Sequence, residues 1–257
     1  MIIDKKEFPI LEFDGTVPAI IEPGTELHKI KIPEHAVICF FNEVIEKING
    51  EENSRFLYNL RSEMGHHPIY ELEYSGKKIA YFHPGVGAPL AAALLEEVIA
   101  LGCRKFIVCG GAGVLKKDIA VGHFIVPVSA IRDEGTSYHY VKPGREIAPS
   151  REALEAIFKT LEKNKFDYIT GKTWTTDAFY RETPGKIELR RQEGCITAEM
   201  EAAAFFAVAQ FRKVKLAQIL YGGDDISSEQ WDSRQFHSRT EVREKLFRLS
   251  VEACLSI

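Results

Sequence analysis

Residues 106–115, FIVCGGAGVL, join an apolar, β-branched run to three glycines within four positions. A short apolar run of this kind is typical of a buried strand in an α/β sheet. Glycine allows backbone N–H groups to approach a ligand closely, which suits an anion or a sugar, although a plain tight turn has the same composition. A second glycine pair, in PGVGAP at residues 84–89, stands between an apolar run and a helical pattern. Two glycine loops at strand ends predict a ligand-binding crevice.

The rest of the chain alternates between short β-branched or aromatic runs and longer helical patterns. The expected strands are residues 17–21, 36–41, 69–74, 78–82, 105–109, 122–131, 168–175 and 214–221. The expected helices are residues 88–101, 150–163, 184–192, 200–211 and 234–257. No repeat, low-complexity tract or long linker separates these segments. The pattern predicts a single α/β domain over residues 1–257.

Composition and charge narrow the class of ligand. Hydrophobic residues make up 45% of the chain and charged residues 27%, which argues against disorder and disulfide-dense scaffolds. The net charge of −4 is too small to indicate a nucleic-acid or membrane partner, so a small molecule is the expected ligand. The eight histidines are scattered, so no metal site is expected. Five cysteines without a C-x-x-C pair, no signal-peptide pattern and no bilayer-length apolar run predict buried, reduced thiols and a cytoplasmic location.

The sequence TAEMEAAA at residues 197–204 places two acids around a methionine at the start of a predicted helix. Acids in a first turn are favoured by the helix dipole, so helix capping is one interpretation. The other is that a carboxylate, Glu199 or Glu201, accepts hydrogen bonds from both hydroxyls of a cis-diol. Met200 would then pack under the sugar ring.

An acidic strand end and an aromatic pair are further candidates. The segment LYGGDDIS at residues 220–227 ends an apolar run with two aspartates. Asp224 either caps a turn or donates a proton to a leaving group, with Arg234 holding it in orientation. Phe179 and Tyr180 stand beside hydrogen-bonding groups, as a heterocycle pocket requires, although aromatic residues are common in core strands too.

The order of these segments is similar to that of the nucleoside phosphorylase family, of the purine nucleoside phosphorylase and uridine phosphorylase type. The resemblance covers nearly the whole chain. It rests on EPG at residues 22–24, GVGAP at 85–89, the glycines at 110–113, IRDEGTSYH at 131–139, TDAFY at 176–180, AEMEA at 198–202 and Asp224.

The resemblance implies a three-layer α/β/α fold around a mixed, partly barrel-like sheet. The implied reaction is reversible phosphorolysis of a purine or pyrimidine ribonucleoside to free base and ribose 1-phosphate. It needs no metal or organic cofactor, because inorganic phosphate is the co-substrate. Homodimers or hexamers in which each active site borrows residues from a neighbour are also implied.

The resemblance also implies roles for individual residues. Glu201, with Glu199 beside it, would hold the ribose diol, and Met200 would pack on the sugar. Phe179 would stack on the base next to Tyr180. Asp224 matches the proton donor to the purine N7, with Arg234 as its helper.

The phosphate and base pockets depart from the family pattern. His28 and Val108 stand where the bacterial hexameric members place phosphate-binding arginines, and Gly111 replaces a usual Ser or Thr. The Gln and Arg pair that marks uracil recognition does not follow Tyr180, so the sequence does not identify which base is bound. The remaining phosphate candidates are Gly24, His28, the backbone N–H groups of Gly111 and Ala112, and Arg61 of a neighbouring subunit.

Two other functions fit the same residues. A nucleosidase of the same superfamily would use water in place of phosphate and needs a carboxylate near the position of Glu26. A nucleoside-binding protein that keeps Glu201 without turnover is the third possibility. Phosphorolysis is preferred, because a hydrolase gains nothing from basic residues such as His28 and Arg61 beside its water.

Overall fold

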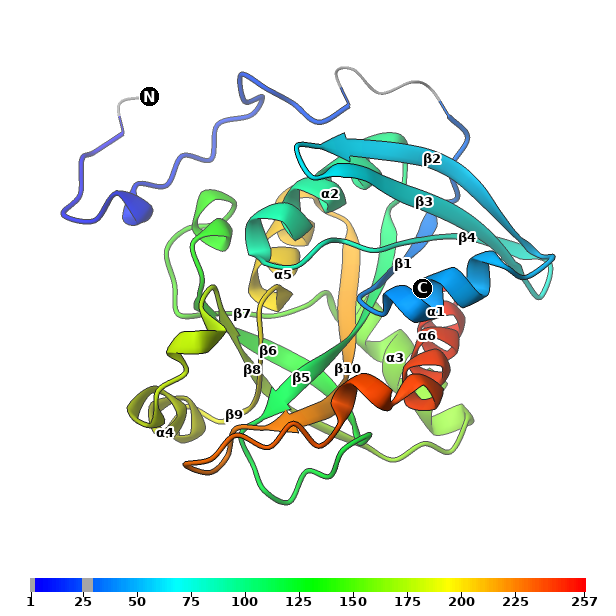
Figure 1. The fold of residues 1–257 in the computed structure, drawn as a ribbon. Helices are drawn as coiled ribbons and strands as arrows, with labels where there is room; N and C mark the ends of the chain where they lie inside the picture. The colour runs from blue at the N-terminus through cyan, green and yellow to red at the C-terminus, as the bar shows by residue number, and fades with distance from the viewer. Residues whose placement is uncertain (1–2, 25–29) are drawn as a thin grey trace.

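A ten-stranded mixed sheet organises the chain, and the computed structural model describes residues 3–24 and 30–257 (Figure 1). The strands are β1 (His35–Cys39), β2 (Ser54–Ser62), β3 (Gly65–Tyr74), β4 (Lys77–Phe82), β5 (Lys105–Val114), β6 (Phe124–Asp133), β7 (Glu146–Ile147), β8 (Tyr168–Thr176), β9 (Cys195–Glu199) and β10 (Lys215–Asp225). The helices are α1 (Asn42–Asn49), α2 (Ala88–Leu101), α3 (Arg151–Lys163), α4 (Pro184–Gln192), α5 (Ala202–Arg212) and α6 (Thr240–Cys254). Short 3₁₀ turns are η1 (Pro9–Leu11), η2 (Thr136–His139), η3 (Phe179–Arg181) and η4 (Phe236–Ser238).

Five of the strands close on themselves. The pairing order runs β10, β6, β8, β9 and β5, and β5 pairs again with β10, so these strands form a closed barrel. The strands β1, β4, β3 and β2 continue the sheet outward from β5. This arrangement confirms the predicted mixed, partly barrel-like sheet.

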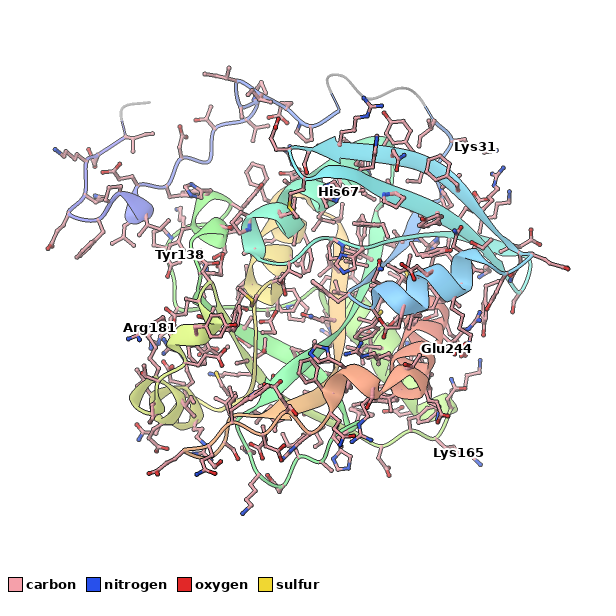
Figure 2. The ribbon with its side chains drawn as sticks, in the orientation of Figure 1. Lys31, His67, Tyr138, Lys165, Arg181 and Glu244 are labelled. Atoms are coloured by element: carbon pink, nitrogen blue, oxygen red, sulfur yellow. The ribbon has the colours of Figure 1, made fainter. Side chains whose placement is uncertain are left out.

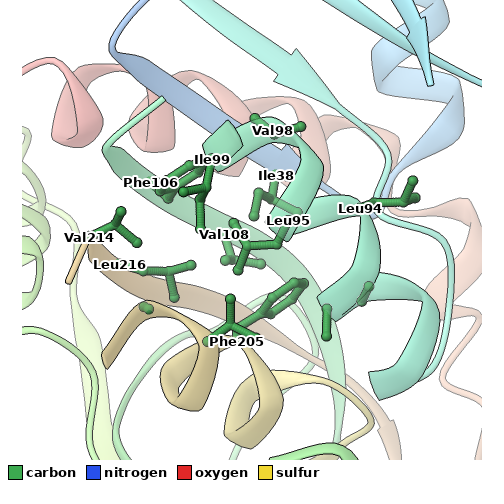
Figure 3. Close-up of a cluster of buried hydrophobic side chains, with 14 of the residues drawn as sticks. Ile38, Leu94, Leu95, Val98, Ile99, Phe106, Val108, Phe205, Val214 and Leu216 are labelled. Atoms are coloured by element: carbon green, nitrogen blue, oxygen red, sulfur yellow. The ribbon is translucent and has the colours of Figure 1, made fainter. Parts of the chain in front are cut away.

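Helices α2 and α5 cover one face of the sheet, where their side chains pack with β1, β5 and β10 (Figure 3). Every residue of α5 from Ala202 to Ala209 is buried, so the helix has no polar stripe. Three alanines, Ala202 to Ala204, let its first turn lie close to the strands. The packing therefore fixes the start of α5, directly after Glu201, against the sheet.

Helices α1, α3 and α6 cover the opposite face. A second buried cluster joins them to the other sides of β1, β5 and β10, including Val37, Ile107 and Ile219. In the described part of the chain no helix is long and apolar enough to cross a membrane. The five cysteines are buried and unpaired, as the sequence predicts.

The glycine segments differ from their prediction as loops. Strand β5 continues through residues 110–113, and β10 continues through Gly222 and Gly223 to Asp225. The two strands pair with each other in parallel over most of this length, so hydrogen bonding holds the glycines in the sheet. A Cβ atom at Gly111 would lie 3.0 Å from the Tyr221 ring, so a larger residue there would force the ring to move by a few tenths of an ångström.

Other boundaries also differ. The strand expected at residues 17–21 is irregular and exposed, and it pairs with no described strand. The C-terminal helix begins at Thr240 instead of residue 234, because Arg234 and Gln235 adopt positive φ angles of 46° and 51°. Helix α1 and strands β2 and β9 were not expected from the sequence.

Candidate active site

A cavity of about 880 Å³ opens where β5, β9 and β10 end and where α5 begins. Most of the candidate residues meet there, contributed by four separate segments. The residues of this group are Phe179, Tyr180, Glu199, Met200, Glu201, Gly111, Ala112 and Asp224. Gly24, Arg61 and Arg234 do not line the cavity, and His28 and Glu26 lie outside the described residues.

Glu199 caps helix α5. Its Oε2 atom accepts hydrogen bonds from the backbone N–H groups of Glu201, at 2.8 Å, and Ala202, at 2.6 Å. Its Oε1 atom accepts a third hydrogen bond, at 2.6 Å, from the Thr175 hydroxyl. Burial raises the pKa of this carboxyl, and the three hydrogen bonds favour its charged form. Because its acceptor capacity is used within the protein, Glu199 acts as the cap and leaves the ligand to Glu201.

Glu201 occupies the turn between β9 and α5 and lines the cavity. Its Oε1 atom accepts a 2.6 Å hydrogen bond from the backbone N–H of Gly87. The side chain is 5% exposed, and burial, with the negative charge of Glu199, raises its pKa to about 8. A buried carboxylate without an ion pair to any described residue is available to accept hydrogen bonds from a ligand.

The glycine pair at residues 85–87 has a local explanation. Gly87 is the N-cap of α2 and has a φ of 93°, a backbone conformation that favours glycine. This conformation directs its N–H to Glu201. The segment therefore positions the carboxylate from a second element.

Asp224 and Glu182 form an acidic end of the cavity. Asp224 Oδ2 accepts a 2.7 Å hydrogen bond from the Trp231 indole N–H, and Oδ1 lies 3.5 Å from the position of a Cβ atom at Gly113. Glu182 is partly buried, and burial together with the negative charge of Asp224 raises its pKa to about 7. Sequence reasoning missed Glu182, although its place two residues after the aromatic pair was a signal.

Arg234 does not orient Asp224, which corrects the prediction from the sequence. Its guanidinium pairs with the carboxylate of Asp225 and donates a 2.7 Å hydrogen bond to the Ile119 carbonyl. Asp224 lines the cavity, whereas Asp225 does not. Burial alone would raise the pKa of Asp225, but hydrogen bonds from Ser227 and the charge of Arg234 lower it below its ordinary value.

Phe179 and Tyr180 form the mouth of the cavity on η3. Their side chains are 50% and 88% exposed, and their ring centroids lie 4.1 Å apart with the planes at 40°. Exposed aromatic faces at a cavity entrance suit stacking on a planar ring. The core interpretation of this pair is therefore wrong.

The open edge of β5 offers backbone donors to the cavity. Strand β1 pairs with β5 as far as Cys109, whose carbonyl accepts a hydrogen bond from the Phe40 N–H, and β9 pairs with β5 only from Gly113 onward. Backbone groups of alternate residues face the same edge of a strand. The amide of Gly111 therefore faces the side that neither β1 nor β9 covers.

Positive charge is scarce in the cavity lining. Arg243, which the sequence analysis missed, lines the cavity but donates to Tyr221 Oη, to Glu43 Oε1 and to the Phe236 carbonyl at 3.0, 2.7 and 3.0 Å. Among the described residues, no group of three or more His, Cys, Asp and Glu side chains could hold a metal ion. The basic side chains of His67, on β3, and Arg181, at the end of η3, lie well apart from each other, so these two residues form no cluster of positive charge (Figure 2).

Comparisons with known proteins agree with this fold. Residues 34–256 match the sequence model of the phosphorylase superfamily. A guanosine phosphorylase of Halorubrum lacusprofundi is 27% identical over 195 residues, which cover 74% of this chain and 80% of the relative. A uridine phosphorylase of Thermococcus kodakarensis is 30% identical over 169 residues, which cover 60% of this chain and 61% of the relative.

Solved structures show the same fold. The crystal structure of purine nucleoside phosphorylase from Toxoplasma gondii in complex with immucillin-H superposes with a TM-score of 0.78 at 20% identity, covering 93% of this chain and 97% of that one. The uridine phosphorylase of Vibrio fischeri ES114 superposes with a TM-score of 0.76 at 21% identity, covering 93% and 99%.

Proposed function

This chain belongs to the phosphorylase superfamily, and on that premise we propose that it is a nucleoside phosphorylase. It catalyses reversible phosphorolysis of a ribonucleoside to free base and ribose 1-phosphate. The observation that carries the proposal is the placement of Glu201, a buried carboxylate beside Met200 in a cavity that also holds Asp224 and an aromatic mouth. The relatives named guanosine phosphorylase and uridine phosphorylase support it.

Glu201 is the proposed ribose ligand. Its carboxylate accepts hydrogen bonds from the 2′- and 3′-hydroxyls, while the Gly87 N–H keeps it in place. Positive charge develops on the sugar as the glycosidic bond breaks, and a carboxylate in a water-poor cavity stabilises that charge. Met200 packs beside the sugar.

Asp224 is the proposed hydrogen-bond partner or acid at the leaving nitrogen of the base. The Trp231 indole orients it, and Glu182 adds a second carboxyl group at the same end of the cavity. A carboxyl group that donates a proton to the leaving base needs an acceptor nitrogen, and a purine presents one at N7 where a pyrimidine has none, so we propose a purine as the preferred base. Phe179 stacks on the ring.

Phosphate is the proposed nucleophile, with no metal or organic cofactor. The Gly111 amide at the open edge of β5 is one donor, and Ala112 is its neighbour. Arg61, exposed on strand β2, is the proposed contribution of a neighbouring subunit in a homodimer or hexamer. A cytoplasmic location and a role in nucleoside catabolism or salvage belong to the same proposal.

The experiment follows base release from a panel of purine and pyrimidine nucleosides, first in phosphate-free buffer and then with phosphate or arsenate. Phosphorolysis predicts release that depends on either anion. Release that ignores both anions would make the protein a nucleosidase, for which Glu26 is the first residue to substitute. Nucleoside binding without any release would make it a binding protein.

A further inference from the structure

Gln218 is a polar side chain in an apolar setting at the floor of the cavity. It lies on β10 and is 1% exposed, and its Oε1 atom accepts no hydrogen bond from any residue that the structure describes. The residues two positions before and after it on the strand, Leu216 and Leu220, are buried hydrophobics. A buried amide oxygen without a donor is unfavourable for folding, so the fold alone does not account for a glutamine here.

The position of Gln218 relates it to the sugar end of the cavity. In the parallel pairing of β10 with β5 it lies opposite Val108, two residues before Gly110. Side chains at Val108 and Leu216 belong to the cluster under α2 and α5 (Figure 3). Alternate residues of a strand share a face, so Gln218 points to the same face of β10 as Leu216. Gln218 and Glu201, the residue that directly precedes α5, both line the cavity.

The stereochemistry of the reaction selects the ligand of this amide. In a β-ribonucleoside the base lies on one face of the ribose, and both ring hydroxyls lie on the other. A nucleophile that displaces the base in line must approach from the hydroxyl face. Gln218 shares the strand face that packs under α5, the helix that follows Glu201, so we infer that its amide lies on the hydroxyl side of the ribose, where it contacts the nucleophile and not the base.

We propose that the Gln218 amide binds the phosphate co-substrate in its protonated form, hydrogenphosphate. This inference rests on the proposed function. The amide Nε2–H donates a hydrogen bond to one phosphate oxygen, and Oε1 accepts a hydrogen bond from the O–H group of another, which satisfies the orphaned acceptor. Val108, which lies opposite Gln218 in the strand pairing, has no polar atom in its side chain and offers the amide no hydrogen bond.

The acceptor gives this site a selectivity that a cation lacks. Hydrogenphosphate and hydrogenarsenate each carry a proton to donate, whereas sulfate carries none at neutral pH. An arginine attracts all three anions, but an amide oxygen accepts a hydrogen bond only from the protonated ones and repels sulfate. The site should therefore bind phosphate and arsenate and discriminate against sulfate.

The test compares Gln218→Met, which keeps the length of the side chain and removes both hydrogen-bonding atoms, with the parent enzyme. We expect KM for phosphate to rise at least tenfold while KM for the nucleoside changes less than twofold. In the absence of nucleoside, phosphate should raise the melting temperature of the parent more than sulfate does, and Gln218→Met should lose that difference. Thr197→Val is the matched control, because Thr197 Oγ1 is also buried without a partner among the described residues but lies outside the cavity lining.

Three outcomes would overturn the inference. A rise in the nucleoside KM with an unchanged phosphate KM would assign Gln218 to the sugar. If the variant kept the phosphate KM of the parent, or if sulfate and phosphate stabilised the parent equally, the amide would not be the phosphate ligand. Base release that is independent of phosphate in the parent would instead contradict the proposed function, so the two failures are distinguishable.

Discussion

The backbone N–H of Gly87 donates a 2.6 Å hydrogen bond to Glu201 Oε1 and joins two residues 114 positions apart in the chain. Gly87 begins α2 and Glu201 precedes α5, so the bond ties together the starts of the two helices that cover one face of the sheet. Glu199 caps α5, because its carboxylate accepts two further hydrogen bonds from backbone N–H groups at the start of that helix. One carboxyl group thus holds the helix, and the other faces the cavity.

Replacing Glu201 by Gln should lower turnover of ribonucleosides at least about 100-fold, because an amide offers one acceptor oxygen where the diol needs two. A 2′-deoxyribonucleoside makes one hydroxyl contact fewer, so it should lose less. Steady-state kinetics on matched ribo and deoxyribo substrates test this, with Glu188→Gln on the exposed face of α4 as the control. Equal losses on both substrates would contradict the diol contact.

The free protein should become less stable as the pH rises through the titration of Glu201. Burial raises its pKa from 4.5 to about 8, so the folded chain binds this proton more tightly than the unfolded chain does. Its contribution to stability is complete below pH 4.5 and is lost as the pH rises to about 8. Nucleoside affinity should change in the opposite direction, because the ionised carboxylate is the form that accepts both hydroxyls.

Melting temperature and nucleoside dissociation constant measured from pH 5.5 to 9 check both trends. Glu201→Gln cannot titrate, so the difference in melting temperature between this variant and the parent should itself depend on pH. A constant difference across this range would show that Glu201 does not titrate there.

Substitutions that affect Asp224 and Asp225 should have different effects: loss of Asp224 should lower activity, and loss of the ion pair of Asp225 should lower stability. Asp224→Asn should lower turnover of purine nucleosides about 10²- to 10⁴-fold, as for loss of a general acid, with little change in melting temperature. Arg234→Gln leaves Asp225 without its ion pair, so it should reduce the free energy of unfolding by about 2–3 kcal/mol, below the range for fully buried pairs. Loss of activity at full stability in Arg234→Gln would restore the role that the sequence suggested for this arginine.

The sequence predicts the helices and strands best where apolar periodicity is uninterrupted. Helices α2 and α4 have the bounds expected, because Pro89 and Pro184 mark their first turns and the pattern ends at a clear break. The strand at residues 17–21 fails, because a β-branched run forms a strand only where a partner strand is available. That availability depends on tertiary structure.

For the site residues too, the sequence predicts what local pattern determines and fails where tertiary structure decides. Sequence reasoning placed Glu199, Glu201 and Asp224 in one cavity and gave the ribose diol to Glu201 by resemblance. The residue pattern alone left the roles of the two glutamates open, because strand β9, which ends at Glu199, was not expected. The sequence also could not show that Asp224 lines the cavity while Asp225 pairs with Arg234, because β10 is irregular between Gly222 and Asp225. Gln218, Glu182 and Arg243 carry no motif, since their importance comes only from burial beside segments distant in sequence.

Glu182 should contribute an ionisation near neutral pH. Burial and the charge of Asp224 raise its pKa to about 7, so Glu182→Gln should remove a transition near that pH from the profile of kcat/KM. Asp224→Asn removes one of the two causes, so the Glu182 pKa should fall in that variant. A titration followed by NMR of ¹³C-labelled glutamate side chains measures this shift directly, and an unchanged pKa would mean that the two carboxyl groups do not interact.

Arg61 and Glu201 should complement each other across a subunit interface. If Arg61 reaches the phosphate of a neighbour, then Arg61→Met and Glu201→Gln each inactivate every site of their own homodimer. A hybrid dimer is different, because the subunit that keeps Glu201 receives the intact Arg61 of its partner, while the other site carries both defects. Equal mixing yields hybrids as about half of all dimers, so activity should recover to about a quarter of the parent value. Mixing after mild dissociation and reassociation, followed by assay at fixed protein concentration, measures the recovery. If Arg61 acted within its own subunit, or had no role, the mixture would show only the average activity of the two variants.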